Sequence, residues 1–125
     1  MISQIKTSLK DIVLGHVENV FTYSPARPTA PCAIIEGAGP FITVNDDEYN
    51  AIYSTNWSIL LMVQAAQNDL ETTVLDTLVD ALVPSLWANQ AVSKLDVDKF
   101  FLTEANAATY LSTRINLTID SQGGN

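Results

Sequence analysis

Two side chains that serve as nucleophile and base in many enzymes occur once each in this sequence: Cys32 and His16. A cysteine nucleophile needs a nearby base and an activating charge, and neither is evident around Cys32. The apolar residues that follow Cys32 are typical of a packed thiol. His16 follows a predicted helix end, where histidines are usually solvated. We therefore predict neither Cys-His nor Ser-His-Asp catalysis, and no enzymatic activity.

Carboxylates gather at two places, Asp46-Asp47-Glu48 and Asp96-x-Asp98. Mg²⁺ and Ca²⁺ prefer oxygen ligands, but no EF-hand spacing follows, and neighbouring side chains rarely converge on one ion. We expect a solvated loop at the first group and two solvent-facing strand residues at the second. Gly37-Ala38-Gly39 lacks the GxGxxG pattern and the lysine of a phosphate-binding loop. No metal or cofactor is therefore expected.

The composition indicates one compact, acidic domain. Of 125 residues, 47% are apolar and 16% charged, and the net charge is −8. Such a chain should repel nucleic acid, since nucleic-acid binders depend on basic surfaces. A mean hydropathy of +0.15 with so few charges indicates that other subunits cover part of the surface. We recognise no signal peptide and no membrane span, and expect a protein made in the cytoplasm.

Hydrophobic periodicity predicts two main helices. Residues 2–15 carry apolar side chains at alternating spacings of three and four, one stripe of a helix. Residues 68–82 form the second helix, with a buried stripe made of Val74, Leu75, Leu78, Val79 and Leu82. Pro84 either ends this helix or opens a short one over residues 85–88.

Strands are predicted between and after the helices. Short strands cover residues 17–23 and 32–36, joined by a proline-rich connector over residues 24–31. Residues 37–51 are the least regular stretch and are interpreted as an irregular loop, in which Phe41-Ile42-Thr43-Val44 is also compatible with an extension of the strand. A long strand over residues 52–65 becomes apolar on both faces at Leu60 and Met62, so both faces should be covered there. A hairpin-like pair follows, near residues 95–101 and 110–120.

These elements give an α+β fold in the order α-β-β-β-α-β-β. We expect a mixed or antiparallel sheet of about five strands with both main helices on one face. Alternation over residues 110–120 places Ile115, Leu117 and Ile119 under the helices and Asn116 on the other face. Residues 1–120 form the single domain, and residues 121–125 a flexible tail.

The succession of elements resembles the tail-terminator (tail-completion) proteins of long-tailed bacteriophages, typified by the lambda terminator. The likeness covers about residues 2–120 and rests on element order, loop positions and size. Its landmarks are the strand entry Ala30-Pro31-Cys32-Ala33-Ile34-Ile35, the strand end Leu60-Leu61-Met62-Val63-Gln64 and a helix that opens with Asp69. The family has no signature residues to match.

The resemblance implies a structural role in the virion. Six subunits form a ring that caps the tail tube, stops its polymerisation and meets the head–tail connector, while DNA passes through the lumen without specific binding. The expected partners are other copies of the chain, the tail-tube protein and the connector or stopper protein; no membrane is involved. Two alternatives stay open: another neck, head-completion or tail-tube component, and a small α+β ligand-binding or enzymatic domain.

The resemblance also points to two groups of residues. The irregular loop is the natural candidate for contact with the tube or the connector, and its expected contact residues are Phe41, Asp46, Asp47, Glu48 and Tyr49. With the helices outside the ring, the polar strand faces line the lumen. This arrangement nominates Asp96, Asp98 and Asp120 as lumen-facing acids, partly neutralised by Lys99 and Arg114, and leaves Asp76 and Asp80 outside.

Overall fold

The computed structural model describes residues 2–23, 25, 29–46, 51–65, 70–89, 91–105 and 108–122. Its elements are α1 (Ile2–Leu14), β1 (Asn19–Phe21), β2 (Cys32–Asp46), β3 (Ala51–Gln64), α2 (Leu70–Trp87), β4 (Val92–Val97), β5 (Phe101–Ala105) and β6 (Ala108–Gln122). The predicted α+β class is confirmed, with one strand more than expected. Half of the proline-rich connector, residues 24 and 26–28, lies outside the described residues.

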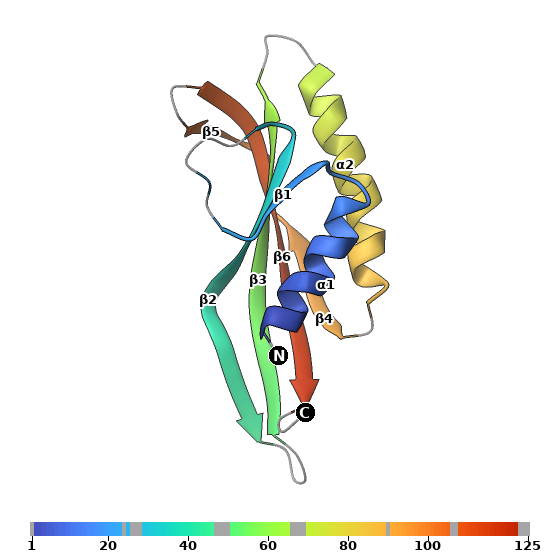
Figure 1. The fold of residues 1–125 in the computed structure, drawn as a ribbon, viewed down its shortest axis with the longest axis vertical. Coiled ribbons are helices and arrows are strands. Elements are labelled where there is room, and N and C mark those ends of the chain that lie inside the picture. Colours follow the sequence, from blue (N-terminus) through green and yellow to red (C-terminus); the bar gives the residue numbers. More distant parts are fainter. Residues whose placement is uncertain are drawn as a thin grey trace.

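The strands form one 6-stranded sheet in the order β1-β2-β3-β6-β4, and β5 also pairs with β6. β1 runs parallel to β2, whereas every other pair is antiparallel. The sheet is therefore mixed, as predicted. Figure 1 shows β3 and β6 along its centre, α1 and α2 packed beside them, and the end of the β2–β3 hairpin projecting beyond the helices.

The main core lies between the helices and one face of the sheet. Leu9 and Val13 of α1 and Leu75, Leu82 and Leu86 of α2 are buried there. Alternate residues of the two central strands meet them: Trp57, Ile59, Leu61 and Val63 of β3, and Ile115, Leu117 and Ile119 of β6. The predicted register of residues 110–120 is confirmed, because the period of a strand sends every second side chain to this face.

A second apolar cluster lies on the other face of the sheet, at the end where β2 begins. Leu60 and Met62 are buried in it, which confirms that β3 is covered on both faces at this end. The other buried members are Cys32, Ile34 and Tyr110, and partly buried Phe21 and Phe101 pack against them. No described side chain of either helix contributes to this cluster. Further along β3, β6 and β4, the described side chains on this face are mostly polar.

Residues 37–46 belong to β2, so the prediction of an irregular loop is wrong for these residues, and the alternative of a strand extension over residues 41–44 is confirmed. β2 runs through Gly37 and resumes its pairing with β3 at Ile42 after a register shift. The shift seats Phe41 edge-on against buried Trp57, with ring centroids 5.0 Å apart. Gly37 permits this packing, because a Cβ there would lie 2.8 Å from the Phe41 ring. Gly37 and Gly39 therefore lie within β2, at the irregularity in its pairing with β3.

α2 continues through Pro84 to Trp87, so the predicted break at Pro84, as a helix end or as the start of a short second helix, is wrong. Pro84 lies on the exposed side of the helix, where solvent can reach the carbonyl oxygen that loses its N–H donor. Leu86, two residues later, is fully buried, and its packing in the main core stabilises the continued helix. Of the predicted buried stripe, Leu75 and Leu82 are buried and Leu78 and Val79 are partly buried, whereas Val74 is 40% exposed.

The last third of the chain contains three strands where a pair was predicted. β4 and β5 both pair with β6, at different parts of its length. Ser121 and Gln122 pair with β3, so the part of the predicted tail that the structure describes belongs to the sheet. Among the described residues, no helix has the length and apolar character needed to cross a membrane.

Candidate functional site

The two groups considered for nucleophilic chemistry lie on different sides of the sheet. His16 is exposed beside the helices, and its Nε2 atom lies 3.1 Å from Ser85 Oγ of α2. Cys32 is fully buried in the cluster on the helix-free face, and this burial raises the pKa of its thiol. A buried, protonated thiol is a packing group and a weak nucleophile. The fold therefore keeps Cys32 and His16 apart.

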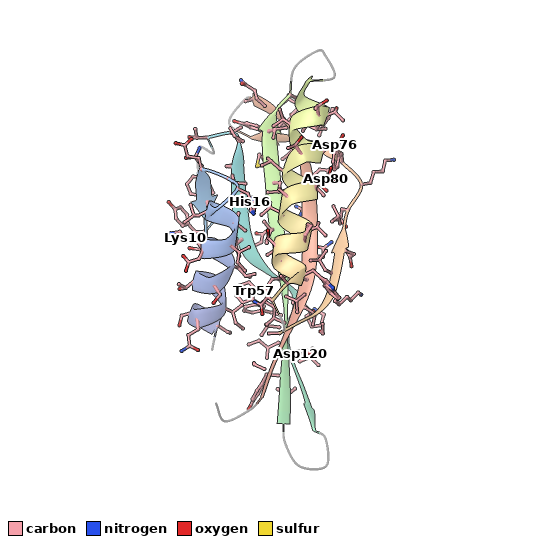
Figure 2. All side chains as sticks on the ribbon, turned by 90° about the vertical axis from the view of Figure 1, so that its right-hand side faces the viewer. Lys10, His16, Trp57, Asp76, Asp80 and Asp120 are labelled. Atoms are coloured by element: carbon pink, nitrogen blue, oxygen red, sulfur yellow. The ribbon has the colours of Figure 1, made fainter. Side chains whose placement is uncertain are left out.

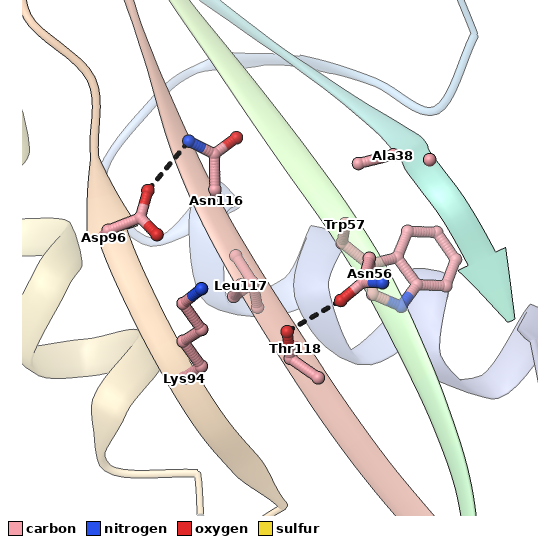
Figure 3. A pocket seen from close by; sticks show the side chains of 9 residues that line it. Ala38, Asn56, Trp57, Lys94, Asp96, Asn116, Leu117 and Thr118 are labelled. Carbon is pink, nitrogen blue, oxygen red and sulfur yellow. Dashed lines mark hydrogen bonds between the residues drawn. The ribbon is translucent and has the colours of Figure 1, made fainter. Parts of the chain in front are cut away.

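The polar part of the helix-free face is the best candidate site, and it is called here the open face. It is made by side chains from three adjacent strands of the sheet: Ser54 and Asn56 of β3, Asn116, Thr118 and Asp120 of β6, and Lys94 and Asp96 of β4. Their position follows from the alternation that buries Ile115 and Leu117 under the helices. Figure 3 shows part of this face.

Asn116 ties two acids of the open face together. Its Nδ2 atom donates to Asp96 Oδ1 and to Asp98 Oδ1, both at 2.9 Å. Asp96 lies on β4 directly opposite Asn116, and Asp98 follows the end of the same strand. The two carboxylates share one amide group, so their negative charges are held close together. The dashed line in Figure 3 marks the bond to Asp96.

A second set of hydrogen bonds joins β6, β3 and the irregular part of β2. Thr118 Oγ1 donates to Asn56 Oδ1 at 2.7 Å, and Asn56 Nδ2 donates to the Pro40 carbonyl oxygen at 2.6 Å. Further along the strands, Ser54 Oγ donates to Asp120 Oδ1 at 2.7 Å. Six of the seven side chains that define the open face, all except Lys94, are thus hydrogen-bonded to one another, which gives the face a defined arrangement before any partner arrives.

These side chains border a shallow cavity of about 300 Å³. Its walls come from β4 on one side, with Lys94 and Asp96, and from Ala38 and Gly39 of β2 on the other. Asn56, Asn116 and Thr118 lie between them. The space over Gly39 is open, because an added Cβ would meet no atom within 4 Å.

The three acids predicted to share a face do share it. Asp96, Asp98 and Asp120 all lie on the helix-free side, each with a hydrogen bond from a neutral side chain. Asp76 and Asp80 are exposed on α2, in the other layer (Figure 2). Of the two residues expected to neutralise these acids, Arg114 lies over the Phe101 ring, 5.1 Å from its centroid, and Lys99 is exposed beyond β4.

The predicted contact loop is reorganised into the end of a hairpin. Phe41 is half-buried against Trp57, so it braces the base of the hairpin. Asp46 is the last residue of β2, and Asp47, Glu48 and Tyr49 lie outside the described residues. Beyond the helices, β2 leaves two apolar side chains uncovered, Ile42 at 43% and Val44 at 54% exposure.

The residues that sequence reasoning missed are the asparagines. Asn116 and Asn56 organise the open face, yet nothing near them in the sequence names their partners. Asn116 stands among apolar residues in an alternating strand, which indicates only that it faces away from the core. Its contacts with Asp96 and Asp98 depend on the β4–β6 register, and a local sequence pattern does not predict such long-range pairing.

Within the described residues, no group of three or more His, Cys, Asp or Glu side chains is placed to hold a metal ion. Comparison with models of known protein families and with curated proteins finds no match to this chain. The open face and the β2–β3 hairpin are therefore the features of the structure that bear on function.

Proposed function

We propose that the chain is a structural subunit of the tail of a long-tailed bacteriophage, and that six copies form a ring that caps the tail tube. The ring stops tube polymerisation and offers its other side to the head–tail connector or stopper protein. Its place is the neck-proximal end of the tail, after synthesis in the host cytoplasm. The order of helices and strands, which resembles that of tail-terminator proteins, supports this proposal.

The acidic open face is the single observation that carries the proposal. Asp96, Asp98 and Asp120 lie on the side of the sheet that the helices leave free, within a chain of net charge −8. When the copies turn this face inward, fixed carboxylates surround the DNA path. They repel the phosphates, so DNA passes through the ring without adhering to it. The helices then form the outer layer.

The β2–β3 hairpin supports a second part of the proposal, the contact with neighbouring tail components. The hairpin projects beyond the helices (Figure 1), and the packing of Phe41 on Trp57 stiffens it at its base. Beyond this brace, Ile42 and Val44 expose apolar surface. A projecting element with uncovered apolar side chains is suited to a protein–protein contact. We assign it to the tube or the connector.

Charge reversal tests the role of the open face. We expect the triple variant Asp96→Lys, Asp98→Lys and Asp120→Lys to slow DNA ejection while tail length stays normal, because the lysines attract the passing phosphates. The matched control is Asp76→Lys with Asp80→Lys on α2, which should leave ejection unchanged. A slowed ejection in the α2 variant and a normal one in the triple variant would reverse the assignment of the two faces.

The cavity on the open face supports the second candidate function, a ligand-binding domain. Its volume of about 300 Å³ is in the range of small-molecule sites. Gly39→Trp should fill this space without disturbing the strand, because nothing lies within 4 Å of an added Cβ. Unchanged tail assembly in this variant is the result expected for a ring subunit. Loss of function with normal folding and assembly would favour the ligand-binding alternative.

A further inference from the structure

β5 is held at the edge of the sheet by one neighbouring strand. Within the described part of the chain, only β6 pairs with it, over Phe101–Ala105. Figure 1 shows β5 apart from both helices. Phe101 and Thr103 of this strand are half-buried, whereas Leu102 and Glu104 are exposed, Leu102 at 68%. β5 therefore buries little apolar surface of its own, and such a segment opens at a low cost in free energy.

The pairing of β5 with β6 also buries two hydroxyl groups that make no hydrogen bond. They are Thr103 Oγ1 on β5 and Ser112 Oγ on β6. Ser112 lies directly opposite Phe101 and is fully buried. Among the side-chain nitrogen and oxygen atoms of the described residues, only Ser58 Oγ is also buried without a partner. A hydroxyl in this state has lost its hydrogen bonds with water and gained none in return, so the two groups weaken the β5–β6 pairing.

An arginine on β6 holds β5 in place. The Arg114 guanidinium lies over the Phe101 ring, with Cζ 5.1 Å from the ring centroid. Phe101 in turn packs against the apolar cluster of the helix-free face, which includes buried Met62 and Tyr110. Because both Arg114 and Phe101 are only half-buried, this cation–π contact is a weak one. The contact can therefore be released without disturbing the main core.

The chain is fixed firmly just before β5. The Asp98 N–H donates to the Arg114 carbonyl oxygen at 2.8 Å, and Thr113 Oγ1 donates to the Asp98 carbonyl oxygen at 2.7 Å. Phe100 packs against the main core, on the other face of the sheet. These contacts anchor the segment between β4 and β5 from both faces. A movement of β5 away from β6 therefore ends at Phe100 and leaves β4 in place.

We infer that β5 is a strap that opens from β6 as a unit, while both helices and the other strands stay folded. Opening hydrates the Thr103 and Ser112 hydroxyls, which offsets part of the loss of backbone hydrogen bonds. It also uncovers Tyr110 and frees the backbone groups of residues 108–112 that face β5, an edge with which another strand can pair. The strap belongs to a single copy of the chain, so this inference goes beyond the proposed ring and does not depend on it.

Amide hydrogen exchange of the full chain, followed residue by residue by NMR, tests the inference. We expect the most protected amide of residues 101–105 to exchange about 100-fold faster than the most protected amide of residues 115–119 of β6. Low denaturant concentrations should hardly change the first rate but should raise the second, because complete unfolding exposes much more surface than the strap does. Equal rates with equal denaturant dependence would overturn the inference, since β5 would then open only when the whole chain unfolds.

Two variants separate the strap from an edge strand that merely frays. Ser112→Ala removes an unpartnered hydroxyl and should slow the exchange of β5 roughly tenfold, because the closed strap no longer buries an unsatisfied group. Arg114→Gln removes the contact with Phe101 and should speed this exchange about threefold. The matched control is Ser54→Ala, which removes a hydroxyl that donates to Asp120 and should leave β5 unchanged. Faster exchange in Ser112→Ala, or no change in either variant, would overturn the inference.

Discussion

The exchange Asn116→Asp changes one amide into a carboxylate at the centre of the open face. The natural side chain donates from Nδ2 to both Asp96 and Asp98 at 2.9 Å. Aspartate loses both hydrogen bonds and places a third negative charge against the two carboxylates. We expect the variant to fold, because position 116 faces away from the main core, but with reduced stability.

The expected loss of unfolding free energy is about 3 kcal/mol. A hydrogen bond to a charged group contributes about 1.5–3 kcal/mol, and the exposure of Asp96 and Asp98 reduces this to about 1 kcal/mol for each bond. Two new like-charge contacts in water-like surroundings add about 1 kcal/mol together, since salt screens them. For a domain of this size, the melting temperature should fall by roughly 10 °C.

Thermal unfolding followed by circular dichroism measures this loss, with Asn116→Ala as the control that removes the hydrogen bonds and adds no charge. We expect Asn116→Ala to lose less than Asn116→Asp. Adding Asp96→Asn to Asn116→Asp should recover part of the stability, because one repulsive pair becomes a donor–acceptor pair. Equal stability of Asn116→Asp and Asn116→Ala, with no recovery in the double variant, would refute the reasoning.

Three further predictions concern the core and the base of the hairpin. Ile115→Asp should abolish folding, because it buries an unpaired charge in the main core; a cooperative native-like melt would show that the β6 register is off by one. Gly37→Val should destabilise the protein by about 1–3 kcal/mol in a denaturant titration by displacing the Phe41 ring, whereas Gly39→Val should change little. Burial raises the pKa of Cys32, so the folded state disfavours its thiolate and stability should decline as the pH rises above about 8.5. Cys32→Ala should flatten that decline, and rapid alkylation of Cys32 in the folded chain at pH 7 would contradict its burial.

The elements with strong periodicity could be predicted from the sequence. α1, β3 and β6 lie where the spacing of apolar residues put them, because each has one face on the core and one face off it. The errors occurred where a local signal met a long-range contact. The glycines before Phe41 indicated a loop, but the packing of that ring on Trp57 holds the segment in the sheet. Pro84 indicated a helix end, but burial of Leu86 extends α2.

The candidate site divides in the same way. Alternation along β6 was enough to place Asp120 on the helix-free side, and its hydrogen bond from Ser54 agrees with that face. It could not reveal that Asn116 holds Asp96 and Asp98, since that contact depends on how β4 aligns with β6. The projecting β2–β3 hairpin was not predicted, because the acidic residues between its two strands are typical of a solvated loop.

Tail length in the absence of the protein tests the central proposal most directly. The proposed function requires that a tailed bacteriophage encodes this chain. With its gene inactivated, electron micrographs should then show tail tubes that grow past their normal length and do not join heads. Supplying the natural chain should restore both the length and the joining. Tails of normal length that attach to heads without the protein would contradict the proposed role in ending the tube.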